Sequence, residues 1–172
     1  MKKIIYLLIF ISIWSCKKDK EINSVDNYFK FKGSTHEIKT CSIEVINFPD
    51  NTKAVSIWFF DEEINYINSE SIANMESLSG LSAVSFLDDI YDGKQLSGQY
   101  KIREDFNYCD VNIDYNANRE DFNQDYSIES GVLSVLKIGN SYEFEFKCKT
   151  ESNDSITGYY NGEVYQYESD QP

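Results

Sequence analysis

Apolar and polar residues alternate along most of the chain, with the period of two that is typical of β-strands. The clearest case lies on either side of Gly139-Asn140, a dipeptide that favours a tight hairpin turn. The turn predicts the pairs Lys137–Tyr142, Val135–Phe144, Leu133–Phe146 and Gly131–Cys148. Residues directly opposite each other share a face, so the hairpin has one apolar face and one charged, solvated face.

Further segments have strand character and are separated by turn residues such as Asp92-Gly93 and Ser97-Gly98. They cover 28–32, 36–46, 53–60, 81–87, 99–102, 109–115 and 158–167. About eight or nine short antiparallel strands predict an all-β domain, either a β-sandwich or a lipocalin-like barrel.

One segment, 70–79, has a different pattern. Ser69 can cap a helix, Ile72, Met75 and Leu78 follow at three-residue steps, and Gly80 is placed to end it. The sequence therefore predicts one short helix that covers an open end of the β-structure, with an irregular loop as the alternative.

The N-terminus has the organisation of an export signal. Lys2 and Lys3 precede an apolar run over 4–14, which is too short to cross a bilayer. The following Ile13-Trp14-Ser15-Cys16 resembles the bacterial lipobox, in which the peptide is cut before a cysteine that is then acylated. This predicts a signal peptide over 1–15, a lipidated Cys16 with a polar tether over 16–26, and a single domain over 27–170. A plain secretory peptide is the alternative.

Charge narrows the range of partners. The 172 residues include 29 acidic and 16 basic side chains, for a net charge of −13, and aromatic residues make up 15%. This composition is that of a globular protein. Such an acidic surface repels phosphate, so no nucleic-acid partner is expected. We expect a monomeric domain held at the membrane through acyl chains on Cys16, with an unknown protein or glycan partner.

The three remaining cysteines, Cys41, Cys109 and Cys148, share strand faces with apolar residues. Alternation predicts that all three point into the core. In an exported protein one pair can form a disulfide, and the sequence does not say which; three buried thiols are the alternative. The spacing is not that of a metal site.

Candidate catalytic residues are few. His36 is the only histidine and has no nucleophile motif near it, so we interpret it as an ordinary surface residue. No cofactor is expected, because phosphate-binding glycine loops are absent.

An acidic stretch offers a calcium hypothesis. Asp114, Asn116, Asn118, Glu120 and Asp125 occupy positions 1, 3, 5, 7 and 12 of a calcium-loop pattern. Arg119 replaces the glycine of that pattern, and we favour a solvated acidic loop.

Tyrosines crowd the last predicted strand, and alternation places Tyr159, Tyr165 and Tyr167 on one face, with Tyr160 beside them. Such rings can stack on sugars or apolar ligands, but more often they cover the end of a barrel. We favour the structural role.

The chain resembles the small, β-rich, mostly uncharacterised lipoproteins common in Bacteroidetes-type bacteria. The resemblance rests on the lipobox-like segment and on turn and strand motifs at 29–33, 96–100, 130–133 and 158–162. It implies a lipoprotein of the outer membrane, on its periplasmic or cell-surface side.

From these observations we expect a non-enzymatic, lipid-anchored β-domain of the outer membrane that binds a ligand or partner, or shields the surface. The first alternative is a lipocalin-like carrier of a small apolar ligand, which requires some of Val55, Ile57, Leu133, Val135, Phe144 and Phe146 to line an open cavity. The second alternative is a hydrolase of cell-surface polymers.

Overall fold

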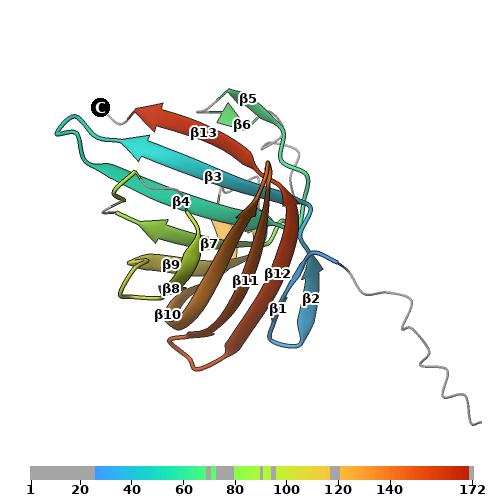
Figure 1. Ribbon diagram of the computed structural model, residues 1–172. Helices are drawn as coiled ribbons and strands as arrows, with labels where there is room; N and C mark the ends of the chain where they lie inside the picture. Colours follow the sequence, from blue (N-terminus) through green and yellow to red (C-terminus); the bar gives the residue numbers. More distant parts are fainter. Residues whose placement is uncertain are drawn as a thin grey trace, which may run out of the picture.

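The computed structural model describes residues 26–68, 71–72, 80–89, 91–93, 96–116 and 121–170, and these form an all-β structure (Figure 1). Eleven strands belong to one mixed sheet, and two short strands pair separately. The strands of the sheet are β1 (Tyr28–Phe31), β2 (Ser34–Glu37), β3 (Thr40–Asn47), β4 (Lys53–Phe60), β7 (Ala83–Asp88), β8 (Gly98–Lys101), β9 (Tyr108–Asn116), β10 (Asp121–Ile138), β11 (Ser141–Thr150), β12 (Ser155–Glu163) and β13 (Tyr165–Asp170). The separate pair is β5 (Tyr66–Asn68) and β6 (Ser71–Ile72).

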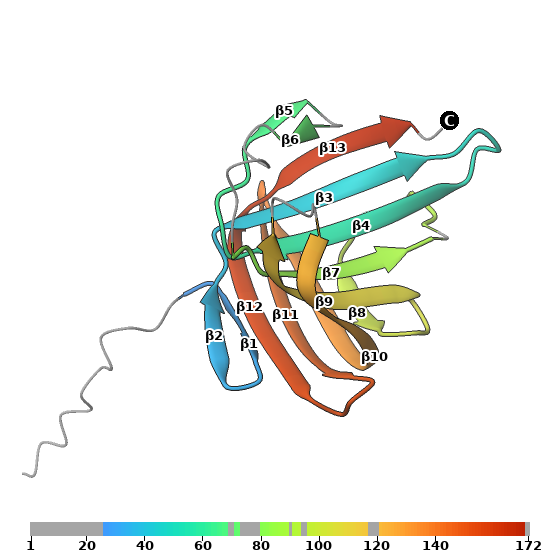
Figure 2. The same ribbon diagram turned by 180° about the vertical axis from the view of Figure 1, so that it is seen from behind.

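The sheet folds over itself into two layers (Figures 1 and 2). The strand order is β13-β3-β4-β7-β9-β10-β11-β12-β1-β2, and β8 pairs with β10 beside this path. The first layer runs from β13 to the first half of β10, and the second layer runs from the second half of β10 to β2. The order has two ends, so the sheet is open. Every regular element in the described residues is a strand, and the all-β prediction is confirmed.

Strand β10 makes the corner between the two layers. Its first part pairs with β9 and its second part with β11, and the register shifts between Ile128 and Ser130. Gly131 follows with φ +137°, and a Cβ atom there would lie 2.4 Å from the Lys147 carbonyl oxygen. A residue with a side chain cannot take this conformation without strain. The corner therefore depends on a bulge and on this glycine.

The predicted hairpin is confirmed in detail. Lys137 faces Tyr142, Val135 faces Phe144, Leu133 faces Phe146 and Gly131 faces Cys148. The apolar face of this hairpin enters the space between the layers, where Leu133, Phe144 and Phe146 are fully buried.

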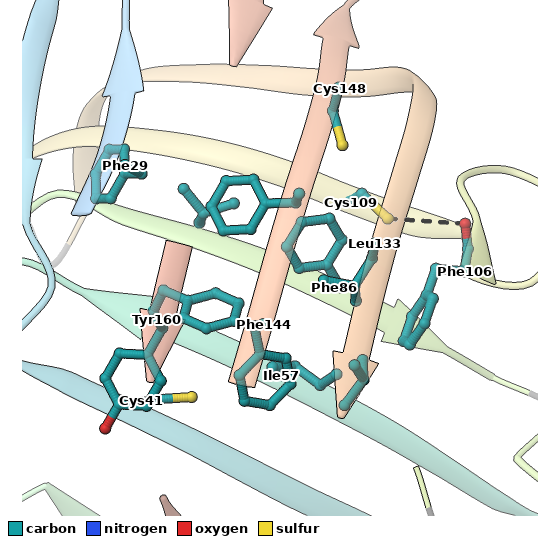
Figure 3. Close-up of a cluster of buried hydrophobic side chains, with 14 of the residues drawn as sticks. Phe29, Cys41, Ile57, Phe86, Phe106, Cys109, Leu133, Phe144, Cys148 and Tyr160 are labelled. Atoms are coloured by element: carbon teal, nitrogen blue, oxygen red, sulfur yellow. Dashed lines mark hydrogen bonds between the residues drawn. The ribbon is translucent and has the colours of Figure 1, made fainter. Parts of the chain in front are cut away.

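The space between the layers is filled by aromatic and aliphatic side chains (Figure 3). The Phe59 ring lies at its centre, with centroid distances of 5.1 Å to Phe144, 5.4 Å to Phe146 and 6.2 Å to Phe86. These distances are typical of edge-on and tilted aromatic packing. All six residues that an interior carrier would need for its cavity belong to this core and are at most 4% exposed.

A second, smaller cluster lies on the outer face of the first layer. Its buried members are Phe60, Ile64, Leu81, Ala83 and Tyr115. Trp58 packs against it and stacks on Phe60 with a centroid distance of 5.6 Å. The first layer is therefore buried on parts of both faces, which explains why β4 has no exposed position.

The helix expected over 70–79 falls mostly outside the described residues. The two that are described, Ser71 and Ile72, form β6, which pairs with β5, so the helix prediction is wrong there. The helix prediction rests on the spacing of three apolar residues, but short apolar spacings do not distinguish a helix from a strand.

Candidate functional site: a cleft at the mouth of the two layers

A cleft of about 470 Å³ opens where the β10–β11 hairpin meets β3 and β13. This volume lies within the usual range for small-ligand sites. The lining residues are Ile43, Val45, Tyr91, Gly93, Leu96, Lys137, Tyr142, Gln166, Tyr167 and Glu168. They come from both layers and from the loop that precedes β8.

A hydrogen bond joins the two walls of the cleft. Gln166 Nε2–H on β13 donates to Tyr142 Oη on β11 over 2.9 Å. The Tyr142 ring is buried, stacks on Phe144 at 5.6 Å, and has the Lys137 ammonium group 5.2 Å from its centre. Tyr142 therefore connects the filled interior to the polar surface of the cleft.

The charged groups of the cleft are of both signs. Lys137 provides a cation at the end of β10, and Glu168 provides a carboxylate on β13. The Asn47 side-chain amide donates to Glu168 Oε2 over 3.5 Å. Aliphatic side chains of Ile43, Val45 and Leu96 form an apolar part of the lining, so the cleft can bind a ligand with both apolar and polar surfaces.

Two tyrosines that line the cleft, Tyr91 and Tyr167, have raised pKa values. The Tyr167 side chain lies beside Tyr66 and Glu44, on the opposite face of the first layer from Gln166 and Glu168, so its hydroxyl points away from the cleft. Burial, followed by the neighbouring Glu44 carboxylate, raises the pKa of Tyr167, which donates to Glu44 Oε2 over 3.2 Å. Burial also raises the pKa of Tyr91, and Asp92 adds to this effect. Both hydroxyls are therefore neutral donors, not anions.

A second cleft of about 410 Å³ adjoins the first. Its lining includes Asn51, Thr52, Lys53, Asp89 and Asp92, together with Tyr91 and Gly93, which line both clefts. The backbone N–H of Tyr91 donates to the Lys53 carbonyl oxygen over 2.9 Å and holds this loop against β4.

His36 lies in β2 and is paired with an acidic residue. Its Nδ1 lies 2.9 Å from Asp61 Oδ2, and its ring stacks on Phe29 at 4.5 Å with nearly parallel planes. The other oxygen, Asp61 Oδ1, accepts the backbone N–H of Ser82 over 2.6 Å. His36 is therefore half-buried, not freely exposed, and joins β2 to the end of β4; the expectation that it has no catalytic role stays a prediction. Within the described part of the chain, no serine or cysteine hydrogen-bonds to His36.

The acidic stretch does not form the expected loop. Asp114 and Asn116 belong to β9, and Asp125 belongs to β10, where it faces Asn112; Asn118 and Glu120 lie outside the described residues. Asp114 accepts a hydrogen bond from the Asn123 side-chain amide. In the described ranges, no group of three or more His, Cys, Asp or Glu is placed to hold a metal ion. A twelve-residue calcium loop needs a continuous turn. Both ends of this stretch are paired as strands, which is not compatible with such a turn.

The three cysteines point into the core as predicted, and each is a free thiol (Figure 3). Burial raises the pKa of Cys109 and of Cys148 to about 12, and raises the pKa of Cys41 as well. Cys109 donates weakly to the Phe106 carbonyl oxygen over 3.7 Å. The pairing of two of them in an oxidising compartment stays a prediction.

The tyrosines near the C-terminus do not share one face. Tyr159 and Tyr160 belong to β12 in the second layer, whereas Tyr165 and Tyr167 belong to β13 in the first layer. Tyr160 is buried in the core and donates to the Glu163 carbonyl oxygen. Tyr165 stacks on Tyr66 at 4.2 Å. The prediction of one common face is wrong because the chain passes from one layer to the other at Val164.

Sequence reasoning missed most of the cleft. Tyr91, Lys137, Gln166 and Glu168 are far apart in the sequence, and Asp61, the partner of His36, lies 25 residues from it. The cleft depends on the parallel pairing of β13 with β3. No local sequence pattern predicts this pairing, so the cleft could not be found from the sequence.

No family model, curated protein or solved structure matches this chain. Cys16 and the preceding apolar run lie outside the described residues. Among the residues that are described, no helix has the length and apolar character needed to cross a membrane.

Proposed function

We propose that this protein is a lipid-anchored, non-catalytic binding domain of the bacterial outer membrane, and that its ligand occupies the cleft between the β10–β11 hairpin and β3–β13. The observation that carries this proposal is an open cleft with mixed lining beside an interior that is already filled. A ligand site needs accessible volume and convergent polar groups, and the cleft offers both.

The same observation favours the cleft over an interior carrier site. Val55, Ile57, Leu133 and Phe146, which such a carrier would use, belong to the same packed core and are fully buried. A ligand could enter there only by displacing packed side chains, which costs several kcal/mol, on the order of 2–5 for one large residue.

The test is a titration followed by NMR of methyl-labelled Ile, Leu and Val residues in the full mature chain. The probes are 4-hydroxyphenylacetamide, which combines a ring with polar groups, and 1-decanol, which is mainly apolar. We expect the methyl signals of Ile43, Val45 and Leu96 to shift with 4-hydroxyphenylacetamide, while those of Val55 and Leu133 remain unchanged.

A matched pair of variants assigns the shifts to the cleft. Val45→Phe places a larger side chain in the cleft and should block binding, whereas Ile46→Phe changes the neighbouring residue on the opposite face of β3 and should not. Shifts at Val55 and Leu133 with 1-decanol would instead support the carrier. No shift with either probe would overturn the proposal of a cleft site.

The lipid anchor has its own test. Acyl chains on Cys16 would hold the protein at a membrane, since each buried methylene contributes about 0.8 kcal/mol. We expect radioactive palmitate to label the wild-type protein in bacteria and not Cys16→Ser, and the variant to leave the membrane fraction. Incorporation that survives Cys16→Ser would contradict this part of the proposal.

A further inference from the structure

The two clefts adjoin each other, because Tyr91 and Gly93 line both of them, and together they are called the groove. With volumes of about 470 and 410 Å³, each part by itself has the size of a small-ligand site. A single small molecule would occupy only one part. A linear ligand with repeating units can occupy both and pass over the Tyr91 side chain between them.

The groove presents polar side chains beside aromatic and aliphatic surface. Lys137, Gln166 and Glu168 line one part, and Asn51, Thr52 and Lys53 line the other. Tyr91 stands at the junction and is only partly exposed, and the Lys53 carbonyl oxygen holds its backbone in place. A sugar ring has apolar C–H faces that stack on an aromatic ring, and hydroxyl groups at its rim that need side-chain donors and acceptors.

Charge excludes some polymers. The whole chain carries a net charge of −13, so anionic polymers are repelled before they reach the groove. Within the groove, Lys53 and Lys137 offset part of the charge of Asp89, Asp92 and Glu168. A neutral ligand rich in hydroxyl groups meets no such barrier.

We infer that the groove binds a linear, neutral oligosaccharide, with one subsite on each side of Tyr91 and with the Tyr91 ring as the stacking surface between them. This inference rests on the proposed function and names its ligand class. An extended peptide can pair with the free edge of a strand, and β13 is such an edge strand beside the first cleft. A peptide is disfavoured because no residue of β13 lines the second cleft, so this edge cannot hold one ligand along both clefts.

The test measures binding by calorimetry, with the full mature chain and with neutral linear sugars as probes. The probes are the trisaccharides and hexasaccharides of β-1,4-linked glucose, xylose and mannose and of α-1,4-linked glucose. For at least one series, we expect the hexasaccharide to bind about tenfold more tightly than the trisaccharide, because only the longer chain spans both subsites.

Variants assign this binding to Tyr91. Tyr91→Ala should weaken hexasaccharide binding by at least about tenfold, and Tyr91→Phe, which keeps the ring, should retain most of it. Tyr108→Ala is the matched control, since Tyr108 is 56% exposed and lines neither cleft. Circular dichroism of each variant checks that the fold is intact.

The other outcomes separate this inference from the proposed function. Equal affinities for trisaccharide and hexasaccharide would overturn the two-subsite groove. Binding of none of the sugars, while 4-hydroxyphenylacetamide still shifts the cleft methyl signals, would overturn the sugar ligand and leave the cleft site standing. Selective binding of unstructured neutral peptides that is lost in Tyr91→Ala would replace the oligosaccharide by a peptide.

Discussion

The interior and the mouth of the molecule are built from the same strands but differ in what fills them. On β11, Phe144 and Phe146 are fully buried between the layers, whereas Tyr142, two residues before Phe144, reaches the cleft. On β3, Cys41 lies in the core and Val45 lines the cleft. Along both strands, packing becomes less complete toward the same end of the molecule.

The comparison teaches where stability and binding are located. Dense apolar contacts in the interior exclude water and stabilise the fold. At the mouth, the lining mixes polar and apolar groups, and open volume remains between the walls. Substitutions in the interior should therefore change stability, while substitutions at the mouth should change binding with small effects on stability.

The largest effect is expected at Phe59. Its ring contacts Phe86, Phe144, Phe146 and Tyr160, so Phe59→Ala removes the centre of the core. We expect the free energy of unfolding to fall by about 4 kcal/mol, as measured by urea denaturation.

Phe48→Ala is the matched control, because Phe48 is 36% exposed and lies at the turn after β3. In Phe48→Ala the free energy of unfolding should fall by less than about 1 kcal/mol. Similar losses in both variants would mean that the stability of the fold does not depend on dense packing in the interior.

The next effect is expected at the corner of the two layers. Gly131→Ala must place a Cβ atom 2.5 Å from Cys148 Cα at φ +137°. Backbone strain and overpacking together should cost about 3 kcal/mol. Gly139→Ala is the control, since Gly139 also has a positive φ, of +63°, but no atom lies within 4 Å of its added Cβ. Gly139→Ala should cost only about 1 kcal/mol. Thermal unfolding measures both variants, and equal losses in Gly131→Ala and Gly139→Ala would contradict the role of close backbone approach at the corner.

The sequence predicted those parts of the fold that depend on neighbouring residues. The hairpin at Gly139-Asn140 could be predicted with its register, because a two-residue turn fixes the pairing. The inward direction of the three cysteines followed from strand alternation in the same way. The first half of β10 was missed because residues 121–127 are mostly polar, and they were interpreted as an acidic loop.

The site could not be predicted, because its geometry depends on distant pairings. Residues 158–167 have continuous strand character, yet the chain changes layers at Val164 and β13 then pairs in parallel with β3. This pairing brings Gln166 to Tyr142, 24 residues earlier in the chain. Periodicity reports which face a residue shares with its neighbours, but it does not report which strand lies beside another.

A smaller effect is expected at the wall of the cleft. Tyr142→Phe removes the acceptor of the Gln166 hydrogen bond and leaves the stacked ring in place. The loss in stability should be about 1 kcal/mol by chemical denaturation. Tyr108→Phe, at an exposed position, should cause no measurable loss. A loss in Tyr142→Phe as large as in Phe59→Ala would show that the mouth, like the interior, determines the stability of the fold.

The smallest effects are expected at two exposed carboxylates, Asp125 and Asp50, whose substitutions should change the stability at neutral pH in opposite directions. Burial, then Asp121 and Asp110, raises the pKa of Asp125 above its ordinary value of 3.8, so the native state holds this proton more tightly than the unfolded chain does. The charged form therefore destabilises the native state at neutral pH. Asp125→Asn should raise the stability at pH 7 by about a few tenths of a kcal/mol after solvent screening, and the gain should vanish below the ordinary pKa, where Asp125 is protonated in both states.

Asp50 provides the opposite case. The Thr52 hydroxyl and backbone N–H donate to Asp50 Oδ1 over 2.6 and 3.0 Å and lower the pKa of this carboxyl. The ionised Asp50 carboxylate therefore stabilises the native state. This stabilisation is present above the ordinary pKa and is lost as the pH falls through the lowered pKa, so Asp50→Asn should lower the stability at pH 7. Urea unfolding of both variants at pH 7 and at acidic pH measures the gain in stability expected for Asp125→Asn and the loss expected for Asp50→Asn. The same measurements are repeated with calcium and then with a chelator. If calcium stabilised the wild type and Asp125→Asn abolished that gain, Asp125 would be a metal ligand, and its charged form would stabilise the native state instead of destabilising it.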